Sequence, residues 1–325
     1  MAASQTLLQL LQSRSIVDCD TMDLEVPKSL GPFVDCTSNQ AIAYNELLKP
    51  EHQELIKKAI EASKTLTEEY PELTAAQLAT EIAMIKLQLE ISKVVTGFVH
   101  VQTNPYFSYS VPKTVANAKR IVQLFKHVDS NFDVSRVCIK IPSSWEGLKA
   151  CQELEAGGIT TLATTLFNIE QAAFAGEVGC HYIAPYVNEL RVHFDPGFVD
   201  EHKAQTLCFE SQRYYEKYNL KTQVLPASLT STTEIMALAG VHHITIAPAL
   251  LRELAATPAS ANTTTSLFDS TTTTFEPAGL MSFKDDEAGF RIAFTRSGKG
   301  EGERKLSQAV NIFCDMQDKM ETMLQ

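Results

Sequence analysis

A lysine interrupts an apolar segment of the chain, and its side chain is suited to covalent carbonyl chemistry. Residues 136–142 (RVCIKIP) are typical of a short buried strand, and Lys140 is the cation inside it. An ammonium at a buried strand end loses hydration, which favours the free amine. A free amine beside a cleft attacks carbonyl carbon and forms a Schiff base. The alternative is a lysine that extends to solvent from the strand end and has no chemical role; the segment alone leaves both open.

Polar residues also occur at the ends of the other predicted strands. They are Asp18, Asn39, Gln102, Asn104, Thr164, Tyr186, Asn188 and Ser228. In a Schiff-base reaction, loss of hydroxide from the carbinolamine requires a proton donor, and cleavage of the adjacent C–C bond requires a base. A carboxylate, a phenol, amides and hydroxyls around one lysine would supply these groups. These residues therefore indicate a Schiff-base site only as a set, and none of them does so alone.

Short β-branched segments alternate with helical patterns along the chain. The predicted strands are Ser15–Asp18, Phe33–Cys36, Gly97–Gln102, Val137–Ile141, Thr160–Thr164, Tyr182–Pro185, Gln223–Pro226 and His243–Ala247. Helical periodicity is clearest in 74–95, 113–127 and 303–324. Strands too apolar to face water indicate a parallel sheet covered by helices. Eight of them predict an α/β fold, a single (β/α)8 TIM barrel over residues 1–325 with a C-terminal helix, whose chemistry lies at the C-terminal strand ends.

Composition narrows the class of protein. The chain has 325 residues, 44% of them hydrophobic, and a net charge of -11, without the basic stripe of a nucleic-acid-binding protein. No segment reaches the roughly 20 apolar residues of a membrane span, and no signal peptide is recognisable. Seven scattered cysteines without CxxC, and eight histidines without HExxH, predict a reduced cytoplasmic protein with no metal site. No GxGxxG follows the first strand, which argues against a dinucleotide cofactor.

One segment departs from the alternating pattern. Residues 257–277 are rich in Thr and Ser and have weak hydrophobic periodicity. They predict an exposed loop between the eighth strand and the terminal helix. A modified tract is the alternative.

Several motifs together resemble the transaldolase family over nearly the whole chain. They are residues 139–147 (IKIPSSWEG), 35–39 (DCTSN), 158–164 (GITTLAT) and 244–254 (ITIAPALLREL). The resemblance implies a (β/α)8 barrel in which Lys140 is the Schiff-base nucleophile and Asp18 the catalytic aspartate. It further implies that Asn39 and Thr164 bind substrate hydroxyls or the catalytic water. No metal, no diffusible cofactor and frequently a homodimer are also implied.

Other positions depart from that family. Gln102 stands where transaldolases carry a water-activating glutamate, and a glutamine holds water but cannot take its proton. Residues 183–188 (IAPYVN) resemble instead fructose-6-phosphate aldolase, a relative that pairs a glutamine and a tyrosine around the water, and Leu162 fits that pattern too. The resemblance therefore implies that Tyr186 is the acid/base partner and that Gln102 positions the water.

The phosphate pocket of the family also differs in this chain. Glu189 and Thr230 stand where transaldolases have two arginines, the residue type that suits phosphate. At about 6 Å and an effective dielectric near 20, Glu189 and a phosphate charge would repel by roughly 2–3 kcal/mol. Arg191 would compensate if the loop bends inward, or it pairs with Glu189. We expect Asn104, Asn188, Ser228 and these two substituted positions to contact the substrate.

The prediction is a Schiff-base lyase or carboligase acting on a non-phosphorylated carbonyl compound. Its partners would be small molecules, a ketose or hydroxyketone and an aldehyde acceptor, and neither nucleic acid nor membrane. One alternative is an authentic pentose-phosphate transaldolase that transfers a dihydroxyacetone unit between sugar phosphates. Another is a non-catalytic paralogue with a binding role. A further alternative is that the same imine drives dehydration, decarboxylation or isomerisation, because an iminium is an electron sink for all three.

Overall fold

Eight parallel strands form the centre of the molecule in a computed structural model that describes residues 5–260, 265–269, 276–277 and 279–325. The strands are β1 (Ile16–Asp20), β2 (Cys36–Thr37), β3 (Val99–Gln102), β4 (Val137–Pro142), β5 (Thr160–Leu166), β6 (Tyr182–Pro185), β7 (Gln223–Val224) and β8 (His243–Ile246). Their order in the sheet is β7-β6-β5-β4-β3-β2-β1-β8. The two outer strands approach each other, since the Thr245 N–H donates to the Pro226 carbonyl just after β7 (3.2 Å). The predicted (β/α)8 barrel is confirmed.

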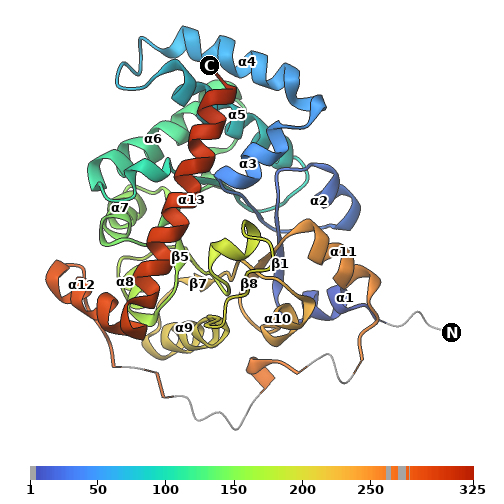
Figure 1. Ribbon diagram of the computed structural model, residues 1–325, viewed down its shortest axis with the longest axis vertical. Coiled ribbons are helices and arrows are strands. Elements are labelled where there is room, and N and C mark those ends of the chain that lie inside the picture. Colours follow the sequence, from blue (N-terminus) through green and yellow to red (C-terminus); the bar gives the residue numbers. More distant parts are fainter. Residues whose placement is uncertain (1–4, 261–264, 270–275, 278) are drawn as a thin grey trace.

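Helices follow the strands and cover the barrel (Figure 1). They are α1 (Leu7–Gln12), α2 (Glu25–Leu30), α3 (Gln40–Leu47), α4 (Gln53–Leu66), α5 (Ala75–Ile91), α6 (Val111–Val128), α7 (Trp145–Ala156), α8 (Ile169–Glu177), α9 (Gln205–Tyr218), α10 (Thr232–Ala237), α11 (Pro248–Ala256), α12 (Glu287–Arg296) and α13 (Glu301–Met323). Short 3-10 segments are η1 (Pro50–His52), η2 (Pro105–Phe107), η3 (Val134–Arg136), η4 (Leu190–His193), η6 (Leu267–Asp269) and η7 (Ser297–Gly300). The three helices predicted from periodicity correspond to α5, α6 and α13.

The second predicted strand begins later than its sequence pattern indicates. We expected Phe33–Cys36, but β2 begins at Cys36. A side chain takes the backbone group that would continue the strand: the Asp35 N–H donates to the Asp18 carboxylate (2.9 Å) and not to the backbone of a neighbouring strand. Phe33 forms only an isolated bridge with Val95. Buried polar side chains inside the barrel therefore shape the strand boundaries.

The long helix α13 crosses the open end of the barrel. It contacts α3, η2, η4 and β5, and the first three of these follow strand ends. In Figure 1 it runs as a single red rod over the strands, from α8 and α12 at one side to α4 and α5 at the other. Phe313 of α13 is fully buried and belongs to an apolar cluster with Tyr186 and Leu190. The C-terminal helix thus covers the end of the barrel where the strands finish.

Part of the Thr/Ser-rich segment differs from the predicted exposed loop. Residues 261–264 and 270–275 lie outside the described part of the chain. Of the described residues, Ser266 is buried, and its hydroxyl donates to the carbonyl oxygens of Ala237 (3.1 Å) and Ala239 (2.7 Å). These bonds hold Ser266 against the end of α10, which explains why the segment is not exposed throughout.

Two further predictions were reduced cysteines and the lack of a membrane-spanning segment. All seven cysteines are free, and six of them are buried. Among the helices of the described residues, none has the length and apolar character that crossing a bilayer requires. The assignment of residues 1–325 to one domain stays a prediction.

Candidate active site

Lys140 lies inside the barrel and not at its surface. All six residues of β4 are buried, and Lys140 is only 1% exposed. Its Nζ lies 5.7 Å from the centre of the Tyr186 ring, and it forms no ion pair within the described part of the chain. The alternative of a lysine that extends to solvent is therefore wrong.

Unpaired polar atoms surround this lysine. Gln102 is the register partner of Lys140 on β3, so both side chains leave the sheet on the same face. Thr164 lies two residues after Leu162, the register partner of Lys140 on β5, and so shares that face. Both amide atoms of Gln102 and the Thr164 hydroxyl are buried without a hydrogen-bond partner among the described residues. A buried unpaired polar group costs about 1–3 kcal/mol, so these atoms suit a bound water or substrate.

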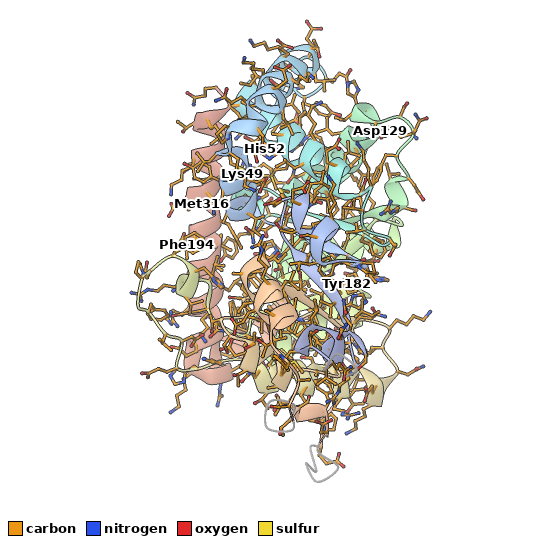
Figure 2. All side chains as sticks on the ribbon, turned by 90° about the vertical axis from the view of Figure 1, so that its right-hand side faces the viewer. Lys49, His52, Asp129, Tyr182, Phe194 and Met316 are labelled. Atoms are coloured by element: carbon orange, nitrogen blue, oxygen red, sulfur yellow. The ribbon has the colours of Figure 1, made fainter. Side chains whose placement is uncertain are left out.

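A cavity of about 380 Å³ opens at the C-terminal ends of the strands, and we call it the barrel-mouth cavity. Three of the predicted site residues line it: Asn39, Tyr186 and Ser228. Lys140 is not itself a lining residue, but its Nζ lies 5.7 Å from the ring centre of Tyr186, which is one. Figure 2 shows Lys49 and Phe194, two further lining residues, on the side of the molecule along which α13 runs.

Asp18 and Asp20 lie on the same face of β1, but only Asp20 lines the barrel-mouth cavity. Asp20 sits at the end of the strand, where its carboxylate accepts a hydrogen bond from the Thr37 hydroxyl (2.6 Å). Asp18 lies two residues, or about 6.6 Å, deeper in the barrel. Sequence reasoning missed Asp20 because it ended the first strand at Asp18, whereas β1 continues to Asp20.

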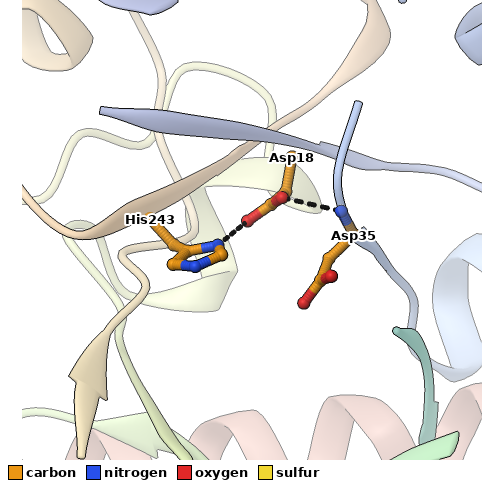
Figure 3. Close-up of side chains that lie close together, drawn as sticks. All are labelled: Asp18, Asp35 and His243. Carbon is orange, nitrogen blue, oxygen red and sulfur yellow. Dashed lines mark hydrogen bonds and ion pairs between the residues drawn. The ribbon is translucent and has the colours of Figure 1, made fainter. Parts of the chain in front are cut away.

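Asp18 belongs to a second set of side chains, the Asp–His cluster of Asp18, Asp35, His100 and His243, which lies deeper in the barrel than Lys140. Figure 3 shows three of its members, Asp18, Asp35 and His243. Asp18 Oδ1 accepts from the Asp35 N–H (2.9 Å), and Oδ2 accepts from His243 Nδ1 (2.8 Å). Asp35 accepts from the Phe98 N–H (2.7 Å) and from His100 Nε2 (3.0 Å). All four carboxylate oxygens are therefore engaged.

Burial and pairing act in opposite directions on the acids of the cluster. Burial raises the pKa of Asp18 to about 6, although the hydrogen bond from His243 opposes this. Burial alone would lower the pKa of His243, but the Asp18 carboxylate outweighs it and raises that pKa. Burial would also raise the pKa of Asp35, but the His100 hydrogen bond lowers it overall.

The Asp–His cluster also has the spacing of a metal site. One ligand atom each of Asp18, Asp35 and His243 lie within 4.8 Å of one another. A divalent cation accepts carboxylate and imidazole ligands at such spacing. Since every oxygen of Asp18 and Asp35 already accepts a hydrogen bond, these two carboxylates are satisfied without a cation.

Of the predicted substrate-binding residues that do not line the barrel-mouth cavity, four have another partner, whereas Thr164 has none among the described residues. Asn104 caps η2 through the Tyr106 N–H (3.0 Å). The Asn188 amide donates to the Ser228 carbonyl (2.9 Å) and to Glu234 (3.0 Å), and Thr230 also bonds to Glu234.

Glu189 is the fourth, and its charge is compensated. It is 2% exposed, and its Oε2 lies 2.6 Å from Arg304 Nη2 of α13. The predicted repulsion between Glu189 and a phosphate assumed an uncompensated carboxylate, and Arg304 removes that condition. Arg191 takes neither predicted role, since it pairs with Asp195 and stacks on Phe198 with 4.3 Å to the ring centre.

The two basic residues of the barrel-mouth cavity were not predicted either. His193 Nε2 lies 2.9 Å from the Ser228 hydroxyl, and burial lowers the pKa of His193. Lys49 lies between Asp23 (2.8 Å) and Glu46 (2.9 Å). Burial alone would lower the pKa of Lys49, but these carboxylates raise it overall. Neither residue lies on a strand, so no strand-end pattern indicated them.

The barrel-mouth cavity has an excess of negative charge. Its lining carries three carboxylates, from Asp20, Asp23 and Glu46, and one lysine. That lysine, Lys49, is already engaged by two of the carboxylates. The cavity therefore offers carboxylates, amides, hydroxyls and one phenol, but no free cation among its lining residues.

Comparisons with known proteins were made for the whole chain. Residues 17–292 match the family described as Transaldolase/Fructose-6-phosphate aldolase. A protein of Shewanella amazonensis named transaldolase is 32% identical over 331 residues, which cover 98% of this chain and 97% of the relative. Proteins with the same name from Shewanella baltica (99% and 98% covered) and Alteromonas mediterranea (97% and 96% covered) are each 31% identical.

Proposed function

The chain belongs to the transaldolase/fructose-6-phosphate aldolase family, and from this premise we propose that it is a Schiff-base lyase or carboligase in which Lys140 forms an imine with a ketone. The observation that carries the proposal is a buried lysine beside the Tyr186 phenol with no ion pair among the described residues. Imine formation needs the nitrogen lone pair, and no carboxylate competes for that nitrogen. The iminium then serves as the electron sink, so the chemistry needs no metal.

The proposed reaction has two stages around Lys140. Its Nζ attacks the carbonyl carbon, a proton is delivered to the resulting hydroxyl, and water leaves to give the iminium. A base then removes the proton of the hydroxyl on the carbon β to the iminium carbon. The bond between the α and β carbons breaks, its electron pair moves toward the iminium nitrogen to give an enamine, and the β carbon leaves as an aldehyde. We assign the proton transfer to Asp20 and no longer to Asp18, because Asp20 lines the barrel-mouth cavity and both oxygens of Asp18 are engaged in the Asp–His cluster.

The remaining residues bind water and substrate in this proposal. Tyr186 acts as the acid/base partner, and Gln102 holds the water that is released and later consumed. The unpaired amide of Gln102 and hydroxyl of Thr164 support this role, since a water would satisfy them. Asn39 and Ser228 line the barrel-mouth cavity and would bind substrate hydroxyls.

The proposed substrate is a carbonyl compound without a phosphate group. Glu189 no longer supports this substrate class, because its charge is compensated by Arg304. The lining of the barrel-mouth cavity supports it instead, since three carboxylates there outnumber the single lysine. Phosphate recognition needs cationic or backbone donors free to bind it, and Lys49 is engaged by Asp23 and Glu46.

Reductive trapping tests the proposal. Borohydride with dihydroxyacetone should add one ketone-derived mass to the protein, and peptide mapping should find it on Lys140. A Lys140→Arg variant should show none, whereas Lys149→Arg, on the neighbouring α7, should be labelled as the native protein is. Full labelling of Lys140→Arg would discard the assignment. Dihydroxyacetone phosphate, used in parallel, should trap at least tenfold less adduct.

A second candidate is an authentic pentose-phosphate transaldolase, which the names of the relatives favour. It would exchange a dihydroxyacetone unit between fructose 6-phosphate and erythrose 4-phosphate. Absence of this exchange in folded protein that still traps dihydroxyacetone would remove this candidate. Absence of any trapped adduct with a panel of ketones would instead favour the non-catalytic paralogue.

The proposal also concerns the partners, the location and the oligomeric state of the protein. We propose a small-molecule ketone and aldehyde as the partners of the site. A cytoplasmic location and a homodimer stay predictions, which fractionation and sedimentation would test.

A further inference from the structure

A second cavity, of about 630 Å³, lies outside the barrel mouth, and we call it the three-helix pocket. Its lining comes from the segment after β5, the start of α9 and the start of α13: Phe167, Asn168, Ile169, His202, Lys203, Ala204, Leu207, Glu210, Ser297, Gly298, Lys299, Glu301, Gly302 and Lys305. Phe167 separates it from the barrel-mouth cavity, since its ring packs edge-on against Tyr186 (6.0 Å between centres). In Figure 1, α8, α9 and the first turn of α13 gather at this corner of the molecule.

Three helices begin at this pocket. Asn168, Ala204 and Gly300 are the N-cap residues of α8, α9 and α13, which have 9, 14 and 23 residues. The first N–H groups of a helix have no partner within it and carry the positive end of the helix dipole. Neither Ala204 nor Gly300 supplies a side-chain cap. Two of the three starts therefore lack a side-chain cap, although the first N–H of α13, that of Glu301, already donates to the Gly298 carbonyl. The three starts open onto the same space, an arrangement that favours an anion.

Asn168 provides an independent indication of a ligand. Its Oδ1 caps α8 by accepting from the Gln171 N–H (3.1 Å). Its Nδ2 is buried and has no partner among the described residues, and the residue is only 7% exposed. A Cβ added at Gly302 would lie 3.1 Å from this Nδ2, so the amide points at the first turn of α13. The unsatisfied donor therefore lies beside the start of α13, in the lining of the pocket.

The charged side chains of the pocket differ in how free they are. Lys305 is bound by Asp200 (2.8 Å) and Lys203 by Glu234 (2.6 Å). Lys299 is exposed and forms no ion pair within the described ranges. Two carboxylates also line the pocket, Glu210 and Glu301, and Glu301 is paired with Arg304 (2.9 Å). Lys299 is thus the cation available to a ligand.

We propose that the three-helix pocket binds a phosphate group, as inorganic phosphate or as the phosphate of a small monoester. Helix starts, an amide donor and a lysine are the donors that phosphate oxygens accept from. The pocket is larger than phosphate itself, and its apolar residues Phe167, Ile169 and Leu207 leave room for an organic part. This site is independent of the imine chemistry proposed for Lys140.

Calorimetric titration of the full chain at low salt tests this proposal, with inorganic phosphate and glycerol 3-phosphate as probes. Asn168→Asp keeps the capping oxygen but replaces the donor with an anion, and Lys299→Glu reverses an exposed charge. Each should weaken binding at least tenfold, with an unchanged melting temperature. Lys221→Glu, the same reversal at an exposed lysine outside the pocket, should bind as the native protein does.

The outcomes separate the site from general charge effects. Saturable binding that only Asn168→Asp and Lys299→Glu weaken supports the pocket, and tighter binding of the monoester would identify an ester as its ligand. Absence of saturable binding, or equal weakening by Lys221→Glu, overturns the proposal. So does loss of binding in Lys49→Ala, since it would put the phosphate in the barrel-mouth cavity. None of these readouts depends on catalysis, so the proposed function stands or falls separately.

Discussion

Two layers of polar side chains lie inside the same barrel, and they differ in how completely they are paired. In the lower layer, the Asp–His cluster, every oxygen of Asp18 and Asp35 accepts a hydrogen bond, although His100 Nδ1 is buried without a partner among the described residues. In the upper layer, beside Lys140, the amide of Gln102 and the hydroxyl of Thr164 are unpaired. A paired network stabilises a fold, whereas an unpaired one costs stability unless a ligand completes it.

The position of each layer relative to the barrel mouth explains this difference. Tyr182, which contacts His100 and His243, lies in Figure 2 on the far side of the barrel from α13. Tyr186, four residues later on the chain, lines the barrel-mouth cavity beside Lys140. Polarity alone therefore does not identify candidate reactive residues; position beside Lys140 or in the lining of the barrel-mouth cavity does. The comparison can be tested by changing one layer at a time.

The largest effect is expected from the upper layer. Lys140→Met should lower activity on any trapped ketone by about 10⁴-fold or more, because the nucleophile is lost. It should leave the free energy of unfolding unchanged or higher, since an apolar side chain replaces a buried amine without an ion pair. Steady-state kinetics and urea unfolding measure the two quantities. A loss of several kcal/mol of stability would show that Lys140 is a structural residue and would remove the contrast between the layers.

The reverse pattern is expected for Asp18→Asn in the lower layer. The pKa of His243 is raised, so its Nδ1 carries a proton at pH 5, and this change sets an amide NH2 group against that donor. The free energy of unfolding should therefore fall by about 3 kcal/mol at pH 5. Urea unfolding against Asp285→Asn, an exposed aspartate, provides the control, which should stay within about 0.5 kcal/mol. The folded fraction of Asp18→Asn should still trap ketone on Lys140. Full stability together with lost trapping would return the catalytic role to Asp18.

Asp20→Asn sharpens the comparison, since it is the same change two residues along the same strand. Removing a proton-transfer group at the barrel-mouth cavity should lower kcat by about a hundredfold. The free energy of unfolding should change little, because Asp20 is only half-buried and its main partner, the Thr37 hydroxyl, can donate to an amide oxygen as well. Native kcat in this variant would contradict the assignment of proton transfer to Asp20.

The pattern of Asp18 and Asp20 also shows where sequence reasoning ends. The fold was predictable because eight apolar segments alternate with helices, and Lys140 because a cation in an apolar strand is conspicuous. Alternate residues of a strand share a face, so choosing between Asp18 and Asp20 requires the strand end to within two residues. That end is set by the pairing of Cys19 and Asp20 with Cys36 and Thr37 of β2, which no local pattern reveals.

Distant partners account for the other differences. Glu189 meets Arg304 on α13, 115 residues later in the chain, and Asn188 meets Glu234. A motif aligned with a family indicates which residue occupies a position, but not which far segment neutralises it. His193 and Lys49 lie on η4 and just before η1, segments that reach the barrel-mouth cavity only through the tertiary fold.

The smallest expected effect concerns pH and tests the lower layer alone. The pKa of Asp18 is raised from 3.8 to about 6 on folding, so its stabilising contribution is full below pH 3.8 and is lost as pH rises through 6. His243, with its raised pKa, acts in the same direction above 6.5, whereas the lowered pKa of Asp35 matters only below 3.8. The stability difference between the native chain and Asp18→Asn should therefore shrink by about 1–2 kcal/mol between pH 5 and pH 8. Urea unfolding of both proteins at the two pH values measures this difference in the free energy of unfolding. A difference that stays constant or grows with pH would mean that the Asp–His cluster does not hold the extra proton. Only geometry would then distinguish the two layers.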